Sequence, residues 1–98
     1  MQKCIDSIIS GRNLDHDYLL WIKTHAIRFG LKGVTFFKND GSIKVVAEGE
    51  EKNLLFFIAK LKRGRYFFSL FSPIDNFSIT WHEPKNEFAD FSISESTE

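Results

Sequence analysis

The alternation of two hydrophobic periodicities along the chain constrains its fold more than any other feature of the sequence. Some segments carry β-branched residues or alternate apolar with polar residues, as strands do, and two segments repeat apolar residues with helical spacing. The predicted strands cover residues 3–10, 33–38, 42–48, 77–83 and, as a short fifth strand, 88–93, and the predicted helices cover 18–29 and 50–63. With this order, both helices can bury their apolar faces only against the same face of one sheet.

Turn and capping residues support these boundaries. Asp17 is expected to cap the first helix, and Gly30 followed by Leu31 is typical of a helix that ends with a left-handed glycine. The run Asn39-Asp40-Gly41 predicts a tight turn that joins the second and third strands in a hairpin. The order β-α-β-β-α-β, with its short fifth strand, therefore predicts an α+β fold. We expect a ferredoxin-like sandwich, in which an antiparallel sheet carries two helices on one face.

Composition narrows the class of protein. The 98 residues include 13 basic and 13 acidic side chains, so no net charge draws the chain to nucleic acid or to an anionic membrane. No apolar run approaches the roughly 18 residues of a membrane-spanning helix. The single cysteine, Cys4, cannot form an internal disulfide and is expected to be a buried, unreactive thiol. We expect a cytoplasmic monomer or weak homodimer that binds no nucleic acid and no membrane, with one domain over residues 1–93 and a flexible tail over 94–98.

Two clusters of side chains suggest chemistry. The run Asp15-His16-Asp17 contains metal-ligand residue types, but adjacent side chains point in different directions, so a solvated loop without metal is expected. No cofactor is expected either.

Basic residues at the end of the second helix precede the aromatic segment Tyr66–Phe71, a combination that can bind single-stranded nucleic acid. The zero net charge favours a solvated helix end instead, and the aromatic segment either packs under the second helix or forms a dimer contact. The basic residues are Lys60, Lys62, Arg63 and Arg65.

Several segments together are typical of one enzyme family. They are Ser10-Gly11-Arg12, Lys23-Thr24-His25-Ala26, Gly30-Leu31-Lys32-Gly33, Asp40-Gly41, Val45-Val46-Ala47-Glu48-Gly49, Asn76-Phe77-Ser78 and Phe91-Ser92-Ile93. In these segments, and over nearly its whole length, the chain resembles the acylphosphatases. The resemblance implies the sandwich fold and the hydrolysis of the carboxyl-phosphate bond of acyl phosphates, without metal or cofactor. In that family the loop Gly-x-Val-Gln-Gly-Val-x-Phe-Arg binds the phosphate, and an Asn on the second strand positions the attacking water.

The chain departs from this motif at the positions that the resemblance assigns to catalysis. Leu14 stands at the Gln position, Asp15 at the second Gly position, Leu19 at the catalytic Arg position and Phe37 at the catalytic Asn position. A leucine supplies no positive charge, an added Cβ hinders close approach of the backbone to phosphate, and a carboxylate repels an anion. The former phosphate loop, by this alignment, comprises Arg12, Asn13, Leu14, Asp15, His16, Asp17 and Tyr18.

These departures predict a catalytically inactive domain with no catalytic residues, which acts as a small binding or interaction module. Either the old site has drifted after loss of function, or it has become an apolar surface for an unknown protein or an apolar ligand. The residues expected on such a surface are Leu14, Leu19, Leu20, Phe36 and Phe37. The alternative is an acylphosphatase with a residual or relocated site, for which Arg12 and Asn39 are the nearby polar candidates.

Overall fold

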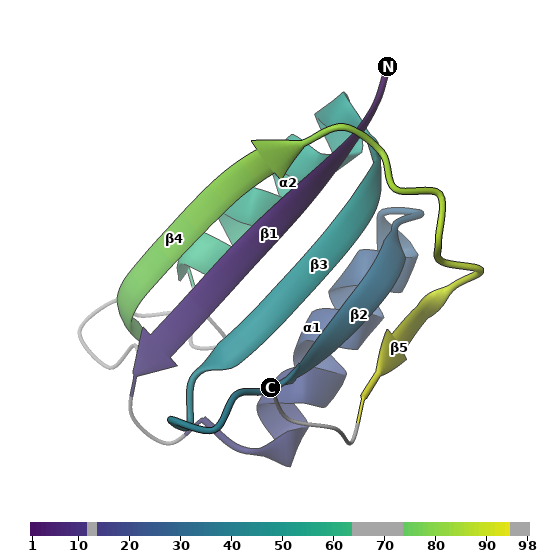
Figure 1. The fold of residues 1–98 in the computed structure, drawn as a ribbon. Coiled ribbons are helices and arrows are strands. Elements are labelled where there is room, and N and C mark those ends of the chain that lie inside the picture. Colours follow the sequence, from purple (N-terminus) through teal and green to yellow (C-terminus); the bar gives the residue numbers. More distant parts are fainter. Residues whose placement is uncertain (12–13, 64–73, 95–98) are drawn as a thin grey trace.

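A computed structural model describes residues 1–11, 14–63 and 74–94 of the chain. They form two layers, a five-stranded sheet and two helices that cover one of its faces (Figure 1). The elements are β1 (Gln2–Gly11), α1 (His16–Arg28), β2 (Lys32–Phe37), β3 (Ile43–Glu50), α2 (Glu51–Arg63), β4 (Ile74–His82) and β5 (Phe91–Ile93). The β-α-β-β-α-β order and the two layers confirm the predicted ferredoxin-like sandwich.

The strand order across the sheet is β4-β1-β3-β2-β5. The pairs β1–β3, β1–β4 and β2–β3 are antiparallel, as the sequence predicts, but β5 pairs with β2 in parallel. The chain leaves β4 at one edge and crosses the open face near the end where β4 stops, to reach the other edge (Figure 1). Because the crossing starts from that end, β5 must run opposite to β4, which is also the direction of β2. The sheet is therefore mixed at this one edge.

Alternation along the strands sorts side chains between the two faces of the sheet. Ile5, Ile9 and Val45 are fully buried on the face that the helices cover. The helices contribute fully buried side chains to the same interior at helical spacing. The buried core consists of Ile5, Ile9, Tyr18, Leu19, Ile22, Ala26, Leu31, Ile43, Val45, Ala47, Leu54, Phe57, Leu61 and Phe91.

The structure corrects the predicted N-cap of α1 and confirms its predicted C-terminal stop. Asp15, not Asp17, caps the helix: its Oδ1 accepts the backbone N–H of Tyr18 at 3.0 Å. The expectation of a cap at Asp17 was wrong. Asp15 and Asp17 both precede the first apolar residue of the helix face, and the helix begins at His16, two residues earlier than the apolar spacing predicted. At the other end, Gly30 has a φ of 72° and the Leu31 N–H bonds the Ala26 carbonyl at 2.9 Å, which confirms the predicted glycine stop.

Parts of the predicted connections lie outside the described residues. These are residues 64–73, which include the whole aromatic segment Tyr66–Phe71, and residues 95–98 of the predicted tail. Strand β4 begins at Ile74, earlier than the predicted start at residue 77. Among the described residues, neither helix is long and apolar enough to cross a bilayer.

Candidate functional site

The segments that the sequence assigns to the former phosphate site lie together at one end of the sheet. Strand β1 ends at Gly11, α1 begins at His16 and β2 ends at Phe37, and all three ends meet at the lower edge of Figure 1. Arg12 and Asn13 lie outside the described residues. The site is therefore described from Leu14 onward on the first segment, and from the β2–β3 hairpin on the second.

The N-terminus of α1 holds its own carboxylate. Asp15 Oδ1 accepts the backbone N–H of Tyr18, and the Asp15 carbonyl accepts the N–H groups of Tyr18 at 3.0 Å and Leu19 at 3.4 Å. The first N–H groups of a helix are the donors that a bound phosphate would use, and the helix dipole favours a negative charge there. At this helix the Asp15 side chain supplies that charge and occupies one of those donors.

Leu19, at the position that the resemblance assigns to the catalytic Arg, is a core residue. It is 2% exposed and belongs to the buried cluster, next to fully buried Tyr18 in the sequence. Leu14 and Phe37 are partly buried against the same cluster. Leu14 and Phe37 thus pack against the same core cluster that contains Leu19, and all three positions carry apolar side chains there.

The two remaining residues of the expected apolar surface lie elsewhere. Leu20 is 45% exposed on the outer side of α1. Phe36 pairs with Lys44 on the open face of the sheet, opposite to the face that Phe37 shares with Ile43. The five residues do not form one exposed apolar surface, because consecutive residues in a strand or a helix point in different directions.

The hairpin end of the site adds a second carboxylate. Ser10, Gly11 and the turn residues Asp40, Gly41 and Ser42 enclose a pocket of about 220 Å³. Asp40 Oδ1 accepts the N–H of Ser42 at 2.9 Å and its hydroxyl at 2.6 Å, and these bonds lower the pKa of Asp40. Among the described residues, the lining of this pocket therefore carries an ionised carboxylate and no cation, which disfavours an anionic ligand.

The metal hypothesis for residues 15–17 gains no support from the geometry. Asp15 is engaged as the helix cap, whereas His16 and Asp17 are exposed in the first turn of α1. Within residues 1–11, 14–63 and 74–94, no group of three or more His, Cys, Asp or Glu side chains converges on a point that could hold a metal ion.

Comparison with known proteins places this arrangement in a family. A family model for acylphosphatase matches residues 6–93, which is most of the chain. The chain belongs to the acylphosphatase family. The crystal structure of acylphosphatase from Bacillus subtilis is 26% identical with a TM-score of 0.81, and the match covers 96% of this chain and 99% of that one.

Two further solved structures share the fold. Full-length HypF, in its phosphate- and nucleotide-bound form, is 27% identical with a TM-score of 0.82, and the match covers 99% of this chain but 12% of that one. An acylphosphatase from Coxiella burnetii is 20% identical with a TM-score of 0.76, and the match covers 95% of this chain and 93% of that one. The acylphosphatase fold of this chain is thus found both as nearly a whole protein and as a small part of a longer one.

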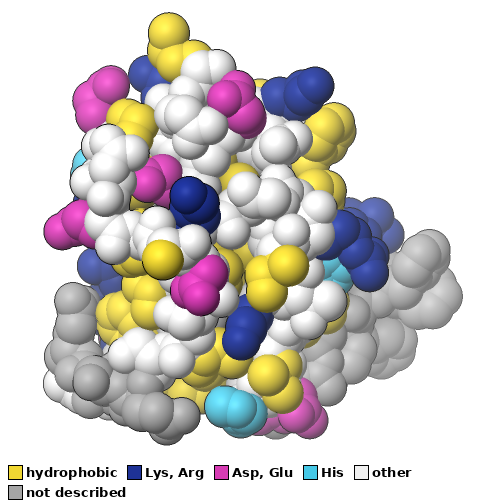
Figure 2. Space-filling view, turned by 90° about the vertical axis from the view of Figure 1, so that its right-hand side faces the viewer, with side chains coloured by type: hydrophobic (Ala, Val, Ile, Leu, Met, Phe, Trp, Pro, Cys, Tyr) yellow, Lys and Arg dark blue, Asp and Glu magenta, His cyan; other side chains and the backbone are white. Residues whose placement is uncertain are grey.

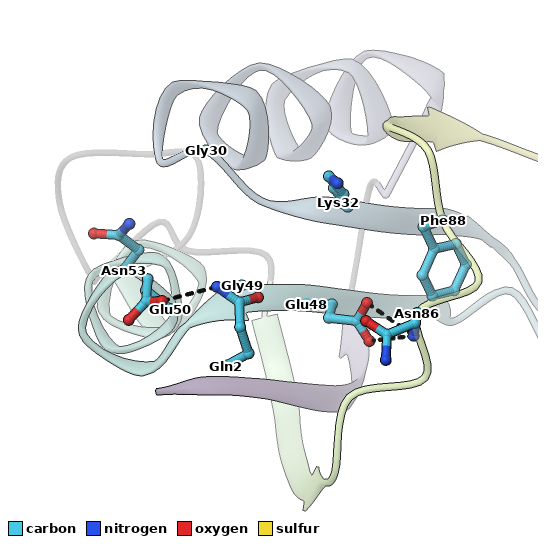
Figure 3. Close-up of a pocket in the computed structure, with 9 residues that line it drawn as sticks. All are labelled: Gln2, Gly30, Lys32, Glu48, Gly49, Glu50, Asn53, Asn86 and Phe88. Atoms are coloured by element: carbon cyan, nitrogen blue, oxygen red, sulfur yellow. Dashed lines mark hydrogen bonds between the residues drawn. The ribbon is translucent and has the colours of Figure 1, made fainter.

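A larger pocket in this acylphosphatase domain lies at the opposite end of the sheet (Figure 3). Its volume is about 370 Å³, and its walls carry two glutamates whose carboxylates are already hydrogen-bonded. Glu48 accepts the backbone N–H groups of Lys85 and Asn86, and Glu50 accepts the N-terminal amine at 2.8 Å and the Gln2 side chain at 2.9 Å. The lining residues are Gln2, Gly30, Lys32, Glu48, Gly49, Glu50, Asn53, Asn86 and Phe88.

Glu48 is the structurally important residue that sequence reasoning missed. It is only 5% exposed, and its bonds fix the connection that crosses from β4 to β5. The sequence contained a signal for this residue: a charged side chain directly follows the apolar run Val45–Ala47. In the structure, this strand is buried on both faces. Such a charge needs partners, and the crossing backbone supplies them.

Cys4 lies on the open face beside Glu48 and under the same connection. It is fully buried, and its pKa is raised to about 11, chiefly by burial and then by the carboxylates of Glu48 and Asp6. A thiol with so high a pKa carries almost no thiolate at neutral pH, and the thiolate is the reactive form. The expectation of a buried, unreactive Cys4 is confirmed for its burial and supported for its chemistry.

Proposed function

We propose that this acylphosphatase-family domain does not hydrolyse acyl phosphates and serves as a binding module. The observation that carries the proposal is the capping of α1 by Asp15. Its carboxylate accepts the Tyr18 N–H at 3.0 Å, so a negative charge of the chain itself sits where the family binds phosphate. A phosphate would have to displace this bond and approach a like charge.

Two energetic terms oppose phosphate at this position. Like charges about 4 Å apart repel by roughly 1–4 kcal/mol between the dielectric of water and that near a protein surface. Loss of one group that stabilises a developing anion costs about 2.7–4 kcal/mol of transition-state energy in well-studied hydrolases. Here both family groups are missing by alignment, since Leu19 and Phe37 offer no charge and no hydrogen bond.

Burial supports the same conclusion. A leucine that merely replaced an arginine at an open site would remain exposed, whereas Leu19 is 2% exposed among core side chains. In the hairpin that borders the site, the pKa of Asp40 is lowered chiefly by its two hydrogen bonds with Ser42 and then by the charge of Lys38.

The comparison with HypF supports a role as a module. In that protein a region similar to this chain accounts for 12% of the length, so the domain there works beside other domains. A domain that has lost its own anion site can still offer the outer surfaces of its helices and sheet to a partner. The binding role is therefore sought on those surfaces rather than in the filled site.

Turnover of benzoyl phosphate tests the enzymatic half of the proposal. The chain should show no hydrolysis above the uncatalysed rate, with Bacillus subtilis acylphosphatase as the positive control in the same assay. In parallel, inorganic phosphate should leave the backbone amide signals of residues 14–18 unmoved in an NMR titration, because the Asp15 carboxylate already occupies the helix N-terminus.

Asp15→Gly and Asp15→Asn form a matched pair for this test. Glycine removes both the cap and the charge and restores the residue type that the family motif has, so phosphate should then shift the amides of residues 14–18. Asparagine can still cap the helix, so it should restore much less. Measurable turnover by the unmodified chain, lost in Arg12→Ala, would instead establish the relocated-site alternative and overturn the proposal.

A further inference from the structure

The outer face of the two helices carries most of the exposed large apolar side chains of the described residues. Leu20 and Ile27 of α1 are 45% and 54% exposed, and Leu55 and Phe56 of α2 are 52% and 55% exposed. Phe56 also stacks on Phe29, which follows α1, with ring centroids 6.1 Å apart. These five residues, which we call the helix-face patch, therefore span both helices and are joined across them by an aromatic contact.

The two helices that carry the patch also carry an excess of positive charge. Residues 16–28 and 51–63 contain six Lys or Arg side chains and two acidic ones, Asp17 and Glu51, whereas the whole chain is neutral. Both acidic residues lie in first turns, where they stabilise the helix ends. The remaining length of each helix is thus cationic. The six basic residues are Lys23, Arg28, Lys52, Lys60, Lys62 and Arg63.

Cations and apolar side chains alternate along this face. On α2, Lys52 precedes Leu55 and Phe56 by one turn, and Lys60 follows Phe56 by one turn. On the opposite side of the molecule the sheet face and the connection 83–90 carry more acidic side chains. In Figure 2, Asp and Glu are more numerous on the left, toward the sheet, whereas Lys and Arg occur on both sides of the view, several of them on the right, toward the helices.

The pKa of His25 responds to the positive charges of both helices. Its pKa is lowered by burial first, and then by Lys60 on α2 and Arg28 on its own helix. Its ring also packs against Trp21, with centroids 4.9 Å apart. An anion placed near Lys60 and Arg28 would offset their charges, so this imidazole serves as a probe of the face.

We propose that the helix-face patch binds an acidic segment of a partner protein that presents apolar side chains between its carboxylates. This inference rests on the proposed function, because it names the surface and the partner chemistry of the binding module. The apolar contacts would cover Leu55, Phe56 and Ile27, and carboxylates would meet Lys52, Lys60 and Arg28. An amphipathic helix laid against two antiparallel helices is a common mode of such recognition.

A protein segment fits better than an anionic membrane. A helix that lies in a bilayer surface keeps its apolar side chains on one continuous face, which sinks into the acyl region. Here the opposite face of each helix is already buried against the sheet, and Lys60 and Arg28 interrupt the exposed apolar residues. A second copy docked by its acidic sheet face would form a head-to-tail contact, which builds rings or filaments rather than a two-fold dimer.

The binding experiment uses a fluorescent peptide of repeating Leu-Glu-Glu-Leu units, with a counterpart in which every Glu is Lys. The full chain should bind the acidic peptide and ignore the basic one, and NMR shifts should concentrate in α1 and α2. The His25 pKa should rise when the acidic peptide is bound. Lys60→Glu and Phe56→Ser should each weaken binding at least about tenfold, and binding should fall as salt is raised.

Lys38→Glu is the matched control, because it makes the same charge change in the β2–β3 hairpin and not on either helix. It should leave peptide binding unchanged. Equal binding of both peptides, no binding, shifts on the open sheet face, preference for vesicles of phosphatidylglycerol, or self-association that blocks the peptide would each overturn the inference. Benzoyl phosphate turnover, measured on the same samples, tests the proposed function separately and is independent of these outcomes.

Discussion

Leu19 and Leu20 are adjacent in the sequence, but the structure assigns them opposite environments, so truncation of each to alanine should have very different costs. Leu19 is 2% exposed in the core and Leu20 is 45% exposed on the outer side of α1. The sequence placed both on one partner surface, where each truncation would cost little stability. The comparison therefore separates a filled core from an exposed binding site.

The expected magnitudes follow from burial. Removing three buried carbons at Leu19 loses about 2.4 kcal/mol of transfer free energy, and a cavity in a packed core raises the total to about 3–5 kcal/mol. At Leu20 roughly half of that transfer term is at stake and no enclosed cavity forms, so the cost should be about 1 kcal/mol. For a domain of this size, each kcal/mol corresponds to about 4–8 °C in Tm.

Urea denaturation followed by far-UV circular dichroism measures both variants against the unmodified chain. The midpoint for Leu19→Ala should drop much further than that for Leu20→Ala, with the slope of the transition unchanged. Leu19→Met, which nearly conserves volume, should cost less than about 1.5 kcal/mol and remains measurable if the alanine variant does not fold. Equal losses for the two alanine variants, within error, would refute the assignment of Leu19 to the core.

Three further predictions concern the cap, the thiol and the helix interface. Asp15→Ala should lower the free energy of unfolding by about 0.5–2 kcal/mol in a thermal or urea melt, because α1 loses its N-cap. Asp15→Asn should cost less, because asparagine can still cap the helix. An Ala variant as stable as the Asn variant would contradict the assignment of Asp15 as the cap. Cys4 should resist iodoacetamide at pH 8 in the native protein and react once the chain is unfolded in urea, because burial and nearby carboxylates raise its pKa to about 11. Rapid labelling of the folded protein would contradict the buried position of this thiol. Lys60→Ala should raise the pKa of His25, followed by NMR of the imidazole, while Lys38→Ala leaves it unchanged.

The lowered pKa of His25 also sets the sign of a pH effect on stability. The folded state binds fewer protons at this residue than the unfolded state, in which the pKa is near 6.5. The contribution of neutral His25 to the free energy of unfolding is therefore fully present above pH 6.5. It decreases as the pH falls toward the lowered pKa of the folded state. Lys60→Ala should weaken this dependence in urea melts at pH 5 and pH 7.5.

Much of the fold follows from the sequence because its elements are marked by local rules. The alternation of strands, the helical stripes and the Gly30-Leu31 stop depend on neighbours a few residues away, and the structure confirms them. The resemblance to acylphosphatases, carried by short runs such as Val45–Gly49, likewise identified the family before any contact was known. The expectation that Leu19 and Phe37 are neighbours came from that resemblance alone and stays a prediction.

Only the tertiary structure decided which side chains are available to a partner. Burial of Leu19, the reversal of Phe36 to the open face and the exposure of Leu20 depend on how α1 packs on the sheet, which no local pattern fixes. The same is true of Glu48, whose partners are backbone groups 37 and 38 residues away in a crossing connection. The sequence by itself determined the elements and the family, whereas long-range packing determined that exposed apolar side chains lie on the outer side of the helices.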